Sequence, residues 1–182
     1  MTQTRRRGLS EMGAFWMERN ALFPFQRTVP EEGNRMQSIR IYEMPDCKMV
    51  SSGVGMFGEG RFVLFDNWLA LQERSMFPKD FLYETEEGFV WLRLFEKGMQ
   101  VPPELEIMDF PGGLYAVATD RDQGTDLAAM NAQVDEFLRQ AGFVRDGSRV
   151  ELGNVITSPR AREILGYDQM DYYTPIKATE RD

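Results

Sequence analysis

A single carboxylate in an apolar stretch, Glu151, is the residue of this sequence best suited to chemistry. It lies in a predicted strand, 148–156, whose apolar members are Val150, Leu152, Val155 and Ile156. A carboxylate in an apolar pocket is costly to ionise, and a cationic ligand would compensate its charge. Because side chains alternate along a strand, Glu151 faces away from Val150 and Leu152. The residues by themselves therefore favour a surface position, unless both faces of the strand are enclosed.

The closing segment, Met170-Asp-Tyr-Tyr-Thr-Pro-Ile-Lys177, holds a second group of candidate residues. In a strand over 170–176, Tyr172 and Tyr173 point to opposite faces, so one of them would enter any space beside the sheet. Aromatic residues make up 12% of the chain. Further candidates for an aromatic lining are Trp68, Trp91, Tyr83 and Tyr115. Large aromatic side chains are more often part of a core, which is the alternative for each of them.

The composition excludes several classes of chemistry. The chain has no histidine and one cysteine, Cys47, so Ser-His-Asp and Cys-His triads, histidine metal sites and structural zinc sites are excluded. Catalysis would have to use carboxylates, tyrosines, lysines or water. We expect no metal and no cofactor. The acidic loop 120–126 lacks the spacing of an EF-hand, and the glycines of 53–60 lack the Lys-Ser/Thr pair of a phosphate-binding loop.

The charge and hydropathy of the sequence limit the classes of partner that the protein is expected to bind. The net charge of −8 argues against direct nucleic-acid binding, which needs clustered Lys and Arg. No apolar run approaches the roughly 20 residues of a membrane span. A single cysteine favours a reducing, cytoplasmic compartment. The length of 182 residues suits one domain with a sizeable core.

Two stretches, Ile39–Val50 and Glu104–Val117, share one design. Aligning Pro45 with Pro111, an offset of 66 residues, places Ile39 on Leu105. The same offset, without a gap, also aligns Ile41 with Ile107 and Trp68 with Val134. Each copy then reads as a strand, a proline corner, a strand and a helix. A duplication of this kind predicts two pseudo-symmetric halves around one core; a chance likeness of two proline-turn hairpins is the alternative.

The predicted elements divide the chain into a tail, one domain and a short end. Residues 1–37 are predicted as an N-terminal tail with a short helix carrying Met12, Phe15, Trp16 and Leu22, and 178–182 as a C-terminal tail. Between them, 38–177 form one domain with repeats of about 38–97 and 104–177. The first repeat has strands 38–44, 47–55, 81–85 and 89–95 and a helix 61–75, with Phe62, Phe65, Trp68 and either Leu71 or Leu69 facing inward. The second repeat has strands 104–110, 113–119, 148–156 and 170–176 and helices 126–141 and 159–165.

Two motifs resemble one protein family. Phe110-Pro-Gly-Gly-Leu-Tyr-Ala-Val117 is similar to a corner motif of the GyrI-like small-molecule-binding domains, which also serve as effector-binding domains of transcription regulators. Met170–Lys177 resembles their closing motif, and the resemblance covers about residues 38–177. It implies an α+β fold of two pseudo-twofold-related strand-helix-strand-strand repeats, with an antiparallel sheet and a ligand cleft between the halves. It also implies that Glu151 lies in this cleft, against the surface position, and that Tyr173 is the family's closing tyrosine.

The sequence departs from the family in two respects. It lacks the DNA-binding region of the regulators, and its N-terminal segment of 37 residues is absent from the shortest members. The role of that segment is not assigned by any pattern in it.

The resemblance implies three alternative functions. The first is a stand-alone protein that captures a lipophilic, cationic small molecule, with Glu151, Tyr173, Trp91, Tyr115 and Trp68 as ligand-binding residues. The second is a hydrolase that opens strained cyclopropane rings of alkylating natural products, in which Glu151 activates water and Tyr173 stabilises the oxyanion. The third is an acidic inhibitor that covers a basic surface of a protein partner, such as gyrase. Binding and hydrolysis share one pocket, so the sequence leaves open whether the protein is an enzyme.

Overall fold

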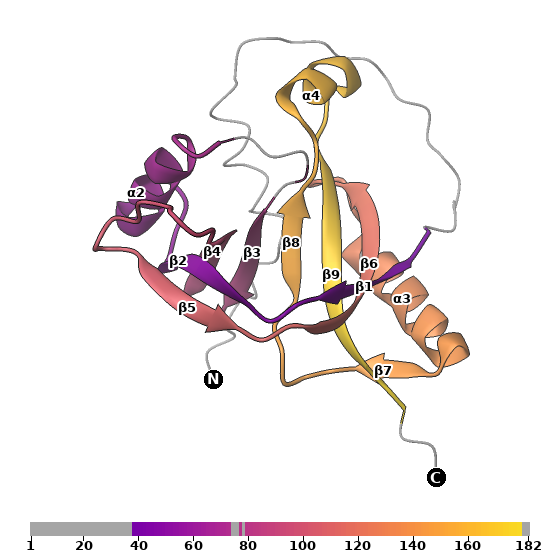
Figure 1. The fold of residues 1–182 in the computed structure, drawn as a ribbon. Coiled ribbons are helices and arrows are strands. Elements are labelled where there is room, and N and C mark those ends of the chain that lie inside the picture. Colours follow the sequence, from indigo (N-terminus) through magenta and orange to yellow (C-terminus); the bar gives the residue numbers. More distant parts are fainter. Residues whose placement is uncertain (1–37, 74–76, 78, 180–182) are drawn as a thin grey trace, which may run out of the picture.

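The structure, a computed structural model, describes residues 38–73, 77 and 79–179. Within these residues nine strands form one antiparallel sheet, and two of the three helices pack on one side of it (Figure 1). The strand order is β1-β6-β9-β8-β3-β4-β2-β5, and β7 pairs with β9. The helix predicted in the N-terminal tail lies outside the described residues.

The elements follow the predicted order in both halves. The first half contains β1 (Arg40–Met44), β2 (Cys47–Gly55), α2 (Gly60–Leu69), β3 (Asp80–Thr85) and β4 (Gly88–Leu94). The second half contains β5 (Glu106–Phe110), β6 (Gly113–Arg121), α3 (Leu127–Ala141), β7 (Phe143–Arg145), β8 (Leu152–Val155), α4 (Pro159–Leu165) and β9 (Gln169–Ala178). The α+β class with two similar halves is thereby confirmed.

Helix ends and helix faces follow from local sequence. Asp126 caps α3, since its carboxylate accepts hydrogen bonds from the N–H groups of Ala128 and Ala129, and Gly142 ends the helix in the left-handed conformation. Helix α2 is shorter than predicted and ends at Leu69. Leu69 packs against the core, whereas Leu71 is 83% exposed. Of the two residues considered for the inward face, Leu69 is therefore the correct one.

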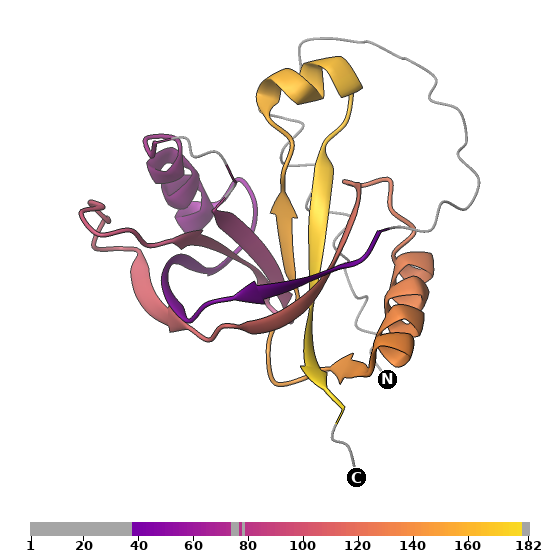
Figure 2. The ribbon, with the colours of Figure 1, turned by 45° about the vertical axis from the view of Figure 1, so that its right-hand side comes forward.

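The two halves exchange strands at the proline corners, which lie around Pro45 and Pro111. Strand β1 pairs with β6 of the other half, and β5 pairs with β2. The register is continuous through the corners: Met44 pairs with Gly113, and three residues later Cys47 pairs with Phe110. The strands on either side of a corner thus pair with the other half and not with each other. In Figures 1 and 2 the β1–β2 and β5–β6 segments run side by side across the front of the domain, from one half to the other.

This exchange curves the sheet. The edge strands β1 and β5 continue directly into β2 and β6, which lie near the opposite ends of the strand order. The sheet can satisfy both connections only by bending until its two ends meet at the corners. We call the side that carries α2 and α3 the helix side, and the opposite side the inner face.

The core consequently has two parts. On the helix side, Phe62, Phe65 and Trp68 of α2 and Met130, Val134 and Leu138 of α3 pack onto the sheet. On the inner face, side chains of the strands alone form a second cluster, with Met44, Met49, Val90, Leu92, Phe110, Tyr115, Val117 and Leu152 as its buried members. Burial of this second set without any helix of the described residues follows from the curvature of the sheet.

Candidate functional site

An aromatic cluster on the inner face joins the two halves of the domain. The ring of Tyr173 on β9 contacts the rings of Tyr42 on β1, Phe81 on β3 and Tyr115 on β6. The centroid distances from Tyr173 are 6.2 Å to Tyr42, 5.6 Å to Phe81 and 6.0 Å to Tyr115. All three contacts are edge-to-face, which is a favoured geometry for aromatic pairs.

Strand register explains why these side chains meet. Tyr42 pairs with Tyr115, and Val117, two residues further along β6, pairs with Tyr173. Cross-strand and diagonal neighbours on one face of a sheet lie within reach of aromatic rings. As expected from alternation, Tyr172 points to the helix side and Tyr173 to the inner face.

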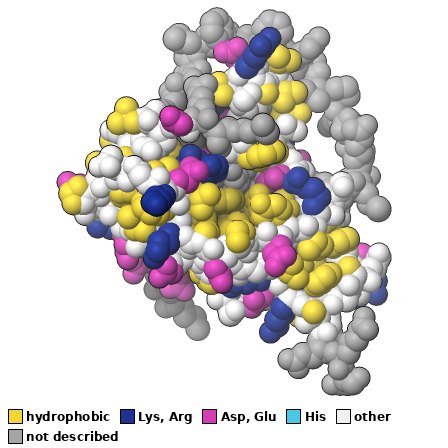
Figure 3. All heavy atoms as spheres, in the orientation of Figure 1, with side chains coloured by type: hydrophobic (Ala, Val, Ile, Leu, Met, Phe, Trp, Pro, Cys, Tyr) yellow, Lys and Arg dark blue, Asp and Glu magenta, His cyan; other side chains and the backbone are white. Residues whose placement is uncertain are grey.

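The cluster is partly open and polar at its edge. Tyr42 is 52% exposed, whereas Tyr115 is fully buried. Burial, together with the nearby Asp171 carboxylate and Tyr42, raises the pKa of Tyr173 to about 12. Its hydroxyl therefore stays protonated at neutral pH. On the face seen in Figure 1, hydrophobic side chains gather across the middle, with acidic and basic side chains around them (Figure 3).

A row of polar side chains lies next to the aromatic cluster. Thr119 on β6, Asp171 on β9 and Asn154 on β8 occupy paired positions on three adjacent strands. Asp171 is buried; its Oδ1 accepts a hydrogen bond from the Thr119 hydroxyl, and its Oδ2 pairs with Arg40 Nη2 at 2.8 Å. Asn154 is also buried, and its Oδ1 has no hydrogen-bond partner among the described residues.

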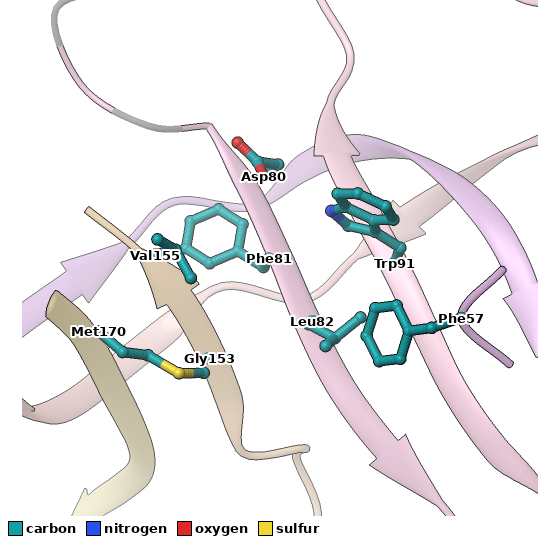
Figure 4. Close-up of a pocket in the computed structure, with 8 residues that line it drawn as sticks. All are labelled: Phe57, Asp80, Phe81, Leu82, Trp91, Gly153, Val155 and Met170. Carbon is teal, nitrogen blue, oxygen red and sulfur yellow. The ribbon is translucent and has the colours of Figure 1, made fainter. Parts of the chain in front are cut away.

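The halves meet at a narrow seam between β3 and β8. These strands share one paired position, Leu82 with Gly153. A cavity at the seam is lined from one half by Phe57, Asp80, Phe81, Leu82 and Trp91, and from the other by Gly153, Val155 and Met170 (Figure 4). Its volume of about 10 Å³ holds roughly one water molecule. The cavity is therefore far too small for a drug-sized ligand as it stands.

The seam cavity contains one carboxylate, Asp80. Burial raises the pKa of Asp80, while the Arg93 guanidinium and a hydrogen bond with Trp91 act in the opposite direction. Protein groups on the helix side thus partly offset the cost of a negative charge on Asp80, and this carboxylate does not face the aromatic cluster.

The two predicted tryptophans are core residues of the helix side. Trp91 packs against Phe62 and Phe65 at centroid distances of 6.0 and 5.3 Å. Trp68 is buried, and its Nε1 donates a hydrogen bond of 2.8 Å to the Gln100 carbonyl. Burial of Trp68 on the inward face of its helix was predicted and is confirmed. Neither tryptophan belongs to the aromatic cluster, which includes only Tyr115 and Tyr173 of the predicted ligand-binding residues.

Glu151 does not lie in a cleft, contrary to the position implied by the resemblance. It precedes β8, its side chain is 56% exposed, and its Oε1 pairs with Arg145 Nη1 at 2.7 Å. Leu152, the next residue, occupies the inner face at the position paired with Tyr173. The surface position favoured by the residues alone is the observed one: Leu152 takes the inner face, and Glu151, just before the strand, lies at the surface.

Sequence reasoning did not select Tyr42, Phe81, Asp171 or Asn154. A signal for Asp171 was present, since it alternates with Tyr173 on one strand. Tyr42 could have been found from its alternation with the inward Met44. Phe81 and Asn154 depend on the pairing of β3 with β8, which local patterns do not encode.

Two further properties concern the described residues only. No group of three or more acidic or cysteine side chains among them is arranged to hold a metal ion. None of their helices has the length and apolarity required to cross a membrane.

Solved structures share this fold. No family model and no curated protein sequence matches the chain. The EcmrR C-terminal domain superposes with a TM-score of 0.54 at 10% sequence identity, covering 80% of this chain and all of that domain. An uncharacterized conserved protein from Listeria innocua gives a TM-score of 0.58 at 9% identity, with 78% of this chain and 93% of that chain covered. A protein described as a hydrolase from Listeria innocua also gives 0.58 at 9% identity, covering 78% and 92%.

At this level of identity the likeness concerns the fold alone. The chain has the GyrI-like fold that the two sequence motifs predicted, with two halves related by a pseudo-twofold axis.

Proposed function

We propose that this protein binds a lipophilic, cationic small molecule on the inner face of its sheet, against the Tyr42–Phe81–Tyr115–Tyr173 cluster. The aromatic cluster is the observation that supports the proposal. Each of β1, β3, β6 and β9 contributes one ring, so both halves take part, and one of the rings, Tyr42, is half exposed to solvent. Aromatic faces attract cations as well as apolar groups.

The charge of the chain also supports a cationic ligand. The net charge of −8 produces a negative potential that raises the local concentration of cations. The hydrolase alternative relied on Glu151 to activate water, and Glu151 is held in a surface ion pair. We therefore make binding the proposal.

The test uses a fluorescent cation and a matched pair of variants. Dansylcadaverine carrying a trimethylammonium group is an aromatic cation whose emission reports transfer to an apolar site. Tyr42→Ala should weaken its binding about threefold to tenfold, the size expected for one aromatic contact. Tyr167→Ala is the control, because Tyr167 contacts Arg121 instead of the cluster. The neutral N-acetyl derivative of dansylcadaverine should bind the unmodified protein more weakly than the cation. Equal effects of the two variants, or no binding of either probe, would contradict the proposal.

A further inference from the structure

Asn154 on β8 carries a buried amide group. Asn154 is 4% exposed, and its Oδ1 has no hydrogen-bond partner among the described residues. A buried acceptor without a partner costs roughly 1–3 kcal/mol, and such groups are rare in native proteins. This cost would be recovered when a bound ligand supplies a donor.

Asn154 lies on the same face as the aromatic cluster. It is two residues from Leu152 on β8, and alternation places both on the inner face. Across β9 it pairs with Asp171, whose neighbour on that face is Tyr173. Across the seam, the pairing of Leu82 with Gly153 sets Phe81 beside Asn154. Asn154 thus occupies a position on the inner face beside those of Asp171, Phe81 and Tyr173.

The charge beside Asn154 also favours a donor over an acceptor. The Asp171 carboxylate is buried, and the partner that neutralises it, Arg40, has a side chain that is 56% exposed on edge strand β1. Because Asp171 is buried, its carboxylate needs a cationic partner. The Arg40 side chain lies largely in solvent, so a ligand ammonium can take its place as the cation at Asp171. A ligand acceptor placed at the Asn154 Oδ1 would instead face that oxygen and the neighbouring Asp171 carboxylate, which repel it.

We propose that Asn154 and Asp171 form a hydrogen-bonding subsite for an N–H donor, so that this face selects primary or secondary ammonium ligands over quaternary ones. The inference rests on the proposed binding function and names the class of ligand within it. The aromatic cluster holds the apolar body of the ligand, and its N–H group points between the Asn154 Oδ1 and the Asp171 carboxylate.

Two probes of equal charge, one with N–H donors at its cationic end and one with methyl groups in their place, test the subsite in the full chain. Dansylcadaverine has a primary ammonium, and its trimethylammonium derivative has the same charge without a donor at that end. The primary ammonium should bind about tenfold more tightly, the ratio expected when an unpaired buried acceptor gains its partner. This comparison needs no variant, so it does not depend on how a substitution affects folding.

The variant Asn154→Leu tests whether Asn154 is responsible for the preference for the primary ammonium. It should reduce the tenfold ratio to about one by weakening only the primary ammonium, and it should not lower the melting temperature, because an unpaired polar group is replaced by an apolar one of similar size. Asn67→Leu, the same change at an exposed site on α2, is the matched control and should keep the ratio. Asn154→Thr retains a hydroxyl acceptor and should give an intermediate ratio.

The outcomes separate the two proposals. If both probes bind the unmodified protein equally well, or if Asn154→Leu leaves the ratio unchanged, the subsite is refuted while binding at the aromatic cluster stands. A loss of melting temperature in Asn154→Leu without a change in the ratio would show that Asn154 is a structural residue only. If neither probe binds, the proposed function fails and the subsite with it.

Discussion

The backbone N–H of Gly112 donates a hydrogen bond of 2.8 Å to Oδ1 of Asp46, and the two residues are 66 positions apart. The same offset aligns the two halves of the sequence, so the residues in contact are equivalent members of the two repeats. Equivalent residues can touch only near the pseudo-twofold axis. The axis therefore passes between the proline corners, where the strands are exchanged.

The close approach of the corners makes Gly112 specific to its position. A Cβ at Gly112 would lie 2.2 Å from the Met44 carbonyl oxygen and 2.5 Å from the Pro45 carbonyl carbon, both backbone atoms that cannot move aside. We expect Gly112→Ala to lower the free energy of unfolding by about 2–3 kcal/mol, measured by urea denaturation. Gly147→Ala, where nothing lies within 4 Å of an added Cβ, should change it by less than about 0.5 kcal/mol. Equal effects of the two variants would contradict the close contact.

Removal of Trp68 should be strongly destabilising. Its indole is buried against the ring of Phe65, at a centroid distance of 5.4 Å. We expect Trp68→Ala to cost about 3–5 kcal/mol, as a large-to-small change in a core, in the same denaturation experiment. Trp68→Phe keeps most of the packing but leaves the Gln100 carbonyl without its donor, so its cost should be smaller. A cost below about 1 kcal/mol for the alanine variant would be inconsistent with this burial.

The carboxyl group of Asp122 should make stability depend on pH. Asp122 is 9% exposed, and burial together with the Asp168 carboxylate raises its pKa from 3.8 to about 6. A raised pKa means that the folded state binds the proton more tightly than the unfolded state. The contribution to stability is therefore complete below about pH 4 and is lost as the pH rises through about 6.

Asp122→Asn removes this titration while keeping the shape of the side chain. It should abolish the decline between pH 4 and 6 and stabilise the protein at pH 7 by about 1–3 kcal/mol, the free energy that corresponds to such a shift in pKa. Urea denaturation across this pH range provides the measurement. An unchanged pH profile in the variant would assign the decline to another group, and Asp168, whose pKa burial also raises, would be the next candidate.

Glu151→Gln should have almost no effect. The substitution removes an exposed ion pair with Arg145, and such pairs contribute about 0–1 kcal/mol. Arg145 also keeps its bonds to Asp135 and Asn131. Titration with the trimethylammonium probe should give an affinity equal to that of the unmodified protein. A marked loss of affinity would instead return Glu151 to the binding site.

Local sequence patterns determined where the strands and helices lie in the chain and which of their side chains share a face. The order of strands and helices, the capping of α3 by Asp126, the opposite facing of Tyr172 and Tyr173, and the burial of Trp68 all depend on neighbours within a few residues. Such patterns are set by strand alternation and helix periodicity. The offset of 66 residues likewise predicted the two similar halves from the sequence alone.

The tertiary structure alone decided where the candidate site lies. Alternation shows that two residues face opposite ways, but not which side a distant strand encloses. The exchange of β1 and β5 at the corners and the pairing of β8 with β3 and β9 brought Tyr42, Phe81 and Asn154 together. These contacts join strands that are far apart in the sequence. For Glu151, by contrast, alternation with Leu152 had already favoured a surface position, and the structure adds only that β8 begins at Leu152 and that the carboxylate pairs with Arg145.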